Sequence, residues 1–73
     1  MEQRIQLLDV VALIADIPEE NLYRGQVGTV IEELAPDVYE VEFSDSSNGH
    51  TYAMLPLKSE QLMALLYAPV QAA

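Results

Sequence analysis

The side chains that could do chemistry in this chain are one imidazole and a large set of carboxylates. His50 is the only histidine, and histidine is the residue type that ordinarily titrates near neutral pH. A catalytic site would need a nucleophile or a carboxylate placed against it, and Asp45, Ser46, Ser47 and Thr51 are its sequence neighbours. These residues fall in a polar segment that is typical of a hairpin loop, where Asp and Ser are ordinary turn residues. We therefore expect no catalytic residue and no enzymatic activity.

Six of the twelve carboxylates occur in three pairs, Glu19-Glu20, Glu32-Glu33 and Glu40/Glu42. Their oxygens are ligands of the kind that calcium prefers, but the pairs lie in different segments and lack EF-hand spacing. The absence of cysteine and the single histidine exclude a thiolate or imidazole cluster. We expect neither a metal nor a cofactor, and a metal-dependent enzyme is the least favoured function.

Charge gives the clearest information about partners. Twelve acidic residues stand against three basic ones, Arg4, Arg24 and Lys58, for a net charge of −9. Nucleic acids and anionic membrane surfaces would repel such a chain, whereas a basic protein would be attracted to it. The same acidity also serves solubility, so the composition leaves steering and solubility as two open explanations.

A protein partner would bind through aromatic and acidic side chains. Tyr39 alternates with apolar residues, so we expect it to be buried, whereas we expect Tyr23 and Tyr52 to be exposed. Carboxylates that project from one strand face would complement basic residues of the partner. The candidate protein-binding residues are Tyr23, Tyr52, Glu32, Glu40 and Glu42.

Five short strands are expected to position these residues. The residues of Val38–Phe43 alternate between apolar and acidic, which is typical of a half-buried antiparallel strand. The other apolar segments are short, rich in β-branched residues or bounded by Pro and Gly. The expected strands are Asp9–Ile17, Thr29–Leu34, Val38–Phe43, His50–Leu57 and Leu62–Tyr67, with one 3-10 turn in Lys58–Gln61 before the last strand.

Three glycines are expected to shape the turns. Gly25 and Gly28 bracket the entry into the second strand, where glycine either adopts a positive φ or lets two backbones approach closely. Asn48-Gly49 marks the hairpin after Phe43, within a polar loop over Ser44–Gly49.

The 73 residues are enough for one domain with one modest core. We expect an ordered part over about residues 8–67 and a frayed tail at Pro69–Ala73. The Leu62–Tyr67 segment is too apolar to be buried wholly in so small a core, and it could join two copies or contact a partner. The expected core residues are Val11, Leu13, Val30, Val41, Phe43, Leu55 and Leu65.

No secretion signal is expected, because the first eight residues lack an apolar region followed by a cleavage site. The longest apolar run, Val10–Ala15, is too short to cross a bilayer, so we expect no membrane insertion. The lack of cysteine fits a reducing compartment, and we expect a cytoplasmic protein.

Four segments carry a family resemblance: DVVAL, RGQVGTVIEEL, VYEVEFSDSSNGHTYAML and LKSEQLMAL. Together they resemble an uncharacterised family of small, mainly cyanobacterial proteins over about Leu8–Leu66. The spacing R-G-x-x-G-T-V…Y-x-V-x-F is also similar to KOW-type and other SH3-like barrels. These include a small accessory subunit of photosystem I and the ferredoxin-docking subunit of the photosynthetic NDH complex. The resemblance implies a small five-stranded SH3-like barrel and carries over no catalytic residues.

Two functions follow as expectations. The first is a non-catalytic acidic module that binds a basic protein, as the antitoxin-like or immunity-like member of a gene pair. The alternative is an accessory or docking subunit of a larger photosynthetic or redox complex.

Overall fold

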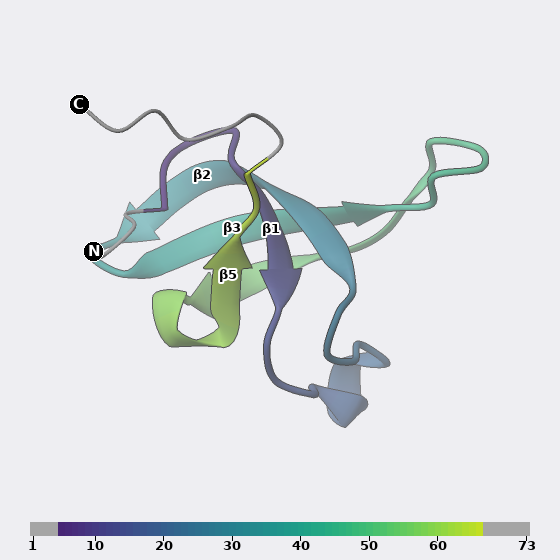
Figure 1. Cartoon of the computed structure of the whole chain (residues 1–73), viewed down its shortest axis with the longest axis horizontal. Coiled ribbons are helices and arrows are strands. Elements are labelled where there is room, and N and C mark those ends of the chain that lie inside the picture. The colour runs from purple at the N-terminus through teal and green to yellow at the C-terminus, as the bar shows by residue number, and fades with distance from the viewer. Residues whose placement is uncertain (1–4, 67–73) are drawn as a thin grey trace.

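The computed structural model describes residues 5–66, which form one antiparallel β-sheet (Figure 1). Its five strands are β1 (Val10–Leu13), β2 (Val27–Ala35), β3 (Val38–Ser44), β4 (Thr51–Lys58) and β5 (Leu62–Ala64). Two 3-10 turns, η1 (Pro18–Glu20) and η2 (Ser59–Gln61), connect strands, and the described residues contain no α-helix. The prediction of a five-stranded all-β domain with a short 3-10 turn before the last strand is confirmed.

The strands are ordered β4-β3-β2-β1-β5, which makes β4 and β5 the two edges of the sheet. No ladder joins these two edges in the part of the chain that the structure describes. In Figure 1 the short strands β1 and β5 run across the long strands β3 and β4. The sheet therefore bends over its own core without being closed by hydrogen bonds, and the SH3-like classification remains a prediction from the sequence.

The long hairpins carry the alternation seen in the sequence. Tyr39, Val41 and Phe43 of β3 are buried, whereas Glu40 and Glu42 face the other side and are half-buried. β3 pairs with β2 through Thr29↔Glu42 and Val30↔Val41, and with β4 along its whole length. The core lies between this part of the sheet and β1 and β5. Its residues are Val11, Leu13, Ile17, Leu22, Val30, Tyr39, Val41, Phe43, Leu57 and Leu62.

Two expected strands are shorter than the sequence suggests. β1 ends at Leu13, because the chain then turns into a loop held by its own contacts: Asp16 accepts a hydrogen bond from the Arg24 amide (2.8 Å), and Ile17 bridges to Leu22. Both bridging residues are buried, so this loop supplies core residues that the strand pattern did not predict. β5 ends at Ala64, and Tyr67 lies outside the described residues.

Leu55 and Leu65 were expected in the core but are only half-buried. Leu55 lies on edge strand β4, which has a neighbour on one side alone, and its side chain packs against the core from there. Leu65 follows the end of β5, where the sheet no longer covers the chain. The expected tail at Pro69–Ala73 lies outside the described residues.

The three glycines fulfil the two roles left open by the sequence. Gly25 and Gly49 adopt positive φ angles of 97° and 75°. Gly28 is buried against β3, and a Cβ atom there would lie 2.8 Å from the Glu42 carbonyl oxygen. The loop with Gly49 spans residues 45–50 and is closed by the Gly49 amide, which donates to the Asp45 carbonyl oxygen (2.7 Å).

Candidate functional site

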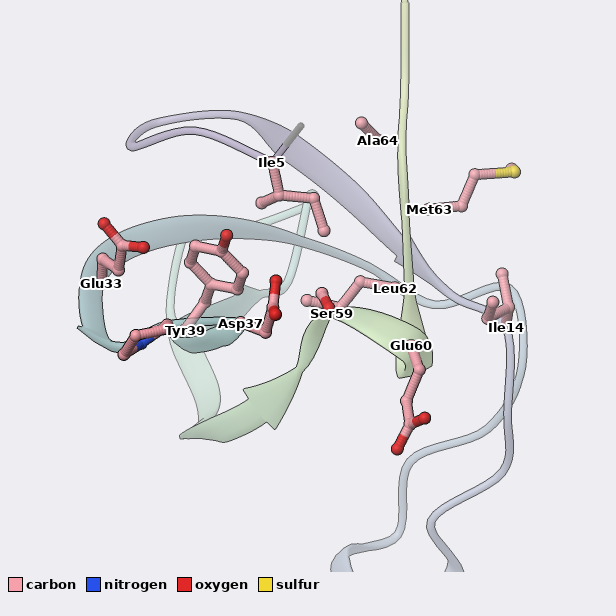
Figure 2. A pocket seen from close by; sticks show the side chains of 11 residues that line it. Ile5, Ile14, Glu33, Asp37, Tyr39, Ser59, Glu60, Leu62, Met63 and Ala64 are labelled. Carbon is pink, nitrogen blue, oxygen red and sulfur yellow. The ribbon is translucent and has the colours of Figure 1, made fainter. Parts of the chain in front are cut away.

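A groove runs along β5 and faces the end of the β2–β3 hairpin (Figure 2). Its volume is about 830 Å³, within the range of ligand-binding pockets. Figure 2 shows Leu62 and Ala64 pointing to one side of β5 and Met63 to the other. The lining residues are Ile5, Ile14, Glu33, Pro36, Asp37, Tyr39, Ser59, Glu60, Leu62, Met63 and Ala64.

Local turns hold the two walls of this groove together. Pro36 and Asp37 connect β2 to β3, and Asp37 has a φ of 63°, a conformation that Asp tolerates better than most residues. The Asp37 carbonyl oxygen accepts a hydrogen bond from the Ser59 amide (2.9 Å), which ties the hairpin turn to η2. Gln61 fixes η2 from the other end, since its side chain accepts from the Lys58 amide (2.9 Å). The hairpin therefore positions η2 and, through it, β5.

Tyr39 forms the floor of the groove. Its side chain is 5% exposed, and its hydroxyl points towards Ile5 (Figure 2). None of the side-chain hydrogen bonds within residues 5–66 involves this hydroxyl. A deeply placed phenol group that opens into a groove and has no partner among the described residues is available to a ligand.

A second hollow of about 510 Å³ continues the groove beyond Ile5. It shares Ile5, Glu33 and Tyr39 with the first, and we call the two together the Tyr39 groove. The other residues that line the second hollow are Gln6, Leu7, Ile31 and Glu32.

The Tyr39 groove is apolar on its floor and acidic on its rim. Glu32, Glu33, Asp37 and Glu60 line it and are exposed, and within residues 5–66 no Lys, Arg or His is among its lining residues. Carboxylates at the edge of a low-dielectric hollow act together on a cation that approaches it. The arrangement suits a ligand with apolar and cationic parts, such as the side chains of lysine or arginine.

The structure confirms that Tyr23 and Tyr52 are exposed, each at 50%. Gln26 connects them: its side-chain oxygen accepts from the Tyr23 amide (2.5 Å), and its side-chain nitrogen donates to the Tyr52 hydroxyl (3.2 Å). The Tyr52 ring also lies over core residue Phe43, at 6.3 Å between centroids. Gln26 thus links the two predicted aromatic residues just before β2, and of their two hydroxyl groups it is the Tyr52 hydroxyl that Gln26 already uses.

The three predicted acidic residues lie along the β2–β3 ladder. Glu32 pairs with Glu40 in register, and Glu42 is two residues further along the same face of β3. The Glu42 carboxylate accepts a hydrogen bond from the Thr51 hydroxyl (2.6 Å). Of the three, only Glu32 lines the Tyr39 groove.

Sequence reasoning did not identify Glu33, Asp37, Tyr39 and Glu60 as site residues. The alternation in β3 correctly placed Tyr39 in the core, but it gave no sign that the hydroxyl end meets a hollow. That hollow exists because η2 and β5 fold back onto the hairpin turn, which is a long-range contact. The one local signal was the acidic residue on each side of that contact, Asp37 and Glu60.

The loop that contains His50 is built from turn contacts. The Asp45 carboxylate accepts from the Ser47 hydroxyl (2.6 Å) and from the Ser47 amide (2.8 Å), and the Asn48 side chain accepts from the His50 amide (2.8 Å). The Ser47 hydroxyl, and then its amide, lower the pKa of Asp45 below the ordinary 3.8. No side-chain hydrogen bond within residues 5–66 involves the His50 imidazole.

Within residues 5–66, no group of three or more His, Cys, Asp and Glu side chains is placed to hold a metal ion. No helix of the described part is long and apolar enough to cross a membrane.

Comparison with known proteins identifies a family without identifying an activity. No curated protein and no solved structure matches the chain. The sequence profile of the family described as "Domain of unknown function (DUF4926)" matches residues 7–64, which include all five strands and most of the Tyr39 groove. The chain therefore belongs to this family of unknown function.

Proposed function

We propose that this chain is a non-catalytic protein-binding module whose Tyr39 groove takes a basic segment of a partner protein. The observation that carries the proposal is the composition of the groove as residues 5–66 form it. Its floor is apolar, the Tyr39 hydroxyl has no hydrogen-bond partner among these residues, and its rim carries carboxylates and no Lys, Arg or His from this range. The net charge of −9 gives the whole molecule a field of the same sign, which speeds the approach of a basic partner.

The partner we propose is a basic protein that this chain covers, as in antitoxin-like or immunity-like pairs, in the cytoplasm. Acidity and a binding groove support this assignment, because a small acidic module can neutralise the functional surface of a basic protein. The charge of the product of the adjacent gene is a direct check. A basic product that forms a complex with this chain is expected, and an acidic product would contradict the pairing.

The groove itself is tested by removing two of its charges. The variant Glu33→Gln/Glu60→Gln keeps the shapes of the side chains and lowers the negative charge at the rim. Solvent-exposed ion pairs contribute about 0.2–1 kcal/mol each, so the loss of two weakens binding by about 2-fold to 30-fold. The probe is a fluorescein-labelled peptide of alternating lysine and valine. Fluorescence anisotropy at low salt gives its affinity for the variant and for the wild type, and the ratio of the two is the quantity to compare.

A matched variant separates local contacts from overall charge. Glu19→Gln/Glu20→Gln changes the net charge by the same amount in η1, which does not line the groove. We expect the control to retain affinity within about 2-fold. Equal losses in the two variants would show that the peptide responds to net charge alone, and a wild-type chain that binds no basic peptide would refute the proposed function.

A further inference from the structure

The two edges of the sheet differ in whether they can accept another strand. At β4, the Ser59 amide bonds to the Asp37 carbonyl oxygen, and the Lys58 amide bonds to the Gln61 side chain instead of to β3. This pattern directs the backbone groups of Met54, Pro56 and Lys58 away from β3, towards the free edge. Pro56 has no N–H, and the Lys58 N–H is occupied, so the β4 edge is poorly suited to strand addition.

Within residues 5–66, the β5 edge has no such protection. The Leu65 amide donates to the Val10 carbonyl oxygen (2.9 Å), and the Ile14 amide donates to the Gln61 carbonyl oxygen (3.0 Å). Residues 61, 63 and 65 therefore bond to β1, while the backbone groups of Leu62 and Ala64 face outwards. The Leu62 amide donates a hydrogen bond to the Ser59 carbonyl oxygen and so is not available at the edge. The Ala64 N–H, the Ala64 C=O and the Leu62 C=O form no backbone hydrogen bond in the described part of the chain.

This open edge borders the Tyr39 groove. All three residues of β5 line the groove, and Leu62 and Ala64 pair with the core residues Leu13 and Val11. A strand added beside β5 would continue the same pleat, so every second side chain would point into the groove. Such a side chain would reach the Tyr39 hydroxyl on the floor and the carboxylates of Glu33 and Asp37 on the far wall (Figure 2).

We propose that the partner segment binds as an extended basic strand that pairs with the free edge of β5 and extends the sheet. The inference rests on the proposed function and adds how the segment binds. Ala64 supplies a donor and an acceptor, and Leu62 supplies an acceptor. The inward-facing side chains are lysine or arginine, whose apolar stems pack on Ile5 and Leu62 and whose cations meet the acidic rim.

The test uses one substitution that removes the outward backbone N–H of β5 and leaves the hydrogen bonds between β5 and β1 in place. Ala64→Pro deletes the outward N–H, which β1 does not use, and proline is tolerated at such a position of an edge strand. Ala64→Val is the matched control, because it adds a side chain of similar size and keeps the N–H. The probe is the labelled lysine–valine peptide, measured by fluorescence anisotropy at low salt, and circular dichroism checks that each variant folds.

We expect Ala64→Pro to weaken peptide binding by about 5-fold to 50-fold, and Ala64→Val to change it by less than about 3-fold. Hydrogen exchange of the wild-type chain gives a second measurement that needs no variant. Saturating peptide is expected to slow exchange at the Ala64 amide by at least about 10-fold, because the amide then lies in a ladder.

The outcomes separate this inference from the proposed function. Unchanged affinity in Ala64→Pro, or an Ala64 amide that exchanges as fast with peptide as without it, refutes strand addition. If Glu33→Gln/Glu60→Gln still lowers the affinity in that case, the groove binds basic peptides in another conformation. If the wild-type chain binds no lysine–valine peptide, both proposals fail.

Discussion

Gly28 is the position where adding one carbon atom should damage the fold most. It is buried in β2, which lies between β1 and β3, and it pairs with Val11 of β1. A Cβ atom there would lie 2.8 Å from the Glu42 carbonyl oxygen, 2.8 Å from Val41 Cγ1 and 3.0 Å from Phe43 Cδ1. These separations are well below the about 3.5–4.0 Å of an ordinary carbon contact, so the Gly28→Ala variant must displace its neighbours.

The loss of stability in Gly28→Ala depends on how far the atoms around the added Cβ can move. One of the three atoms belongs to the backbone of β3, which is held by β2 on one side and β4 on the other. Overpacking of this kind costs about 1–3 kcal/mol, and alanine recovers about 0.4–1 kcal/mol by restricting the unfolded chain. A net loss of about 1.3 kcal/mol is a large share of the about 4–11 kcal/mol expected for a domain of this size. It lowers Tm by about 5–10 °C.

Thermal and urea unfolding followed by circular dichroism measure this loss. Val27→Ala is the neighbouring control, because its side chain lies on the exposed face of β2 and its removal should cost less than about 1 kcal/mol. A Gly28→Ala variant as stable as wild type would refute the close approach of β2 and β3 at this point. Equal destabilisation by the two variants would show that the contact with β3 is not what requires glycine.

Three further predictions concern single side chains. Tyr39→Phe removes a hydroxyl that has no partner among the described residues, so the free energy of unfolding should change by less than about 0.5 kcal/mol while affinity for the lysine–valine peptide falls. A loss of stability above about 1 kcal/mol would mean that the hydroxyl already has a partner. Ser47→Ala removes the hydrogen bond that does most to lower the pKa of Asp45, so NMR titration should show that pKa rising towards 3.8. Because the pKa of Asp45 in the folded protein lies below 3.8, its contact with Ser47 stabilises the loop above pH 3.8, and this stabilisation is lost as the pH falls through the folded pKa. An effect of Ser47→Ala on stability that is confined to neutral pH would contradict the assignment. Gln26→Ala should speed hydrogen exchange at the Tyr23 amide, whose acceptor it removes, and leave Phe43 exchange unchanged; equal protection in both proteins would disprove the bridge.

Much of the fold could be predicted because it depends on local patterns. The alternation of Tyr39, Val41 and Phe43 set the inward face of β3, and the paired proline and aspartate marked its start. Strand lengths were predicted less well, because they depend on where a neighbour stops. β1 stops where the loop with Asp16 and Arg24 begins to bond to itself, a contact that no periodicity records.

The candidate site was predictable only in part for the same reason. Exposure of Tyr23 and Tyr52 follows from their amphipathic side chains, and the structure confirms it. The Tyr39 groove requires η2 to bond to the β2–β3 turn and β5 to lie along β1, which are contacts between segments distant in sequence. The pattern of residues within one segment cannot predict a hollow that forms between two segments.

NMR chemical-shift mapping of the bound peptide tests whether the Tyr39 groove is the binding site. Amide and aromatic resonances of the wild-type chain are followed while the lysine–valine peptide is added at low salt. We predict the largest shifts at Ile5, Glu33, Tyr39 and Ala64, in the Tyr39 groove. Shifts concentrated at Tyr23, Gln26 and Tyr52, with the Tyr39 groove unchanged, would contradict it and assign binding to the tyrosine pair.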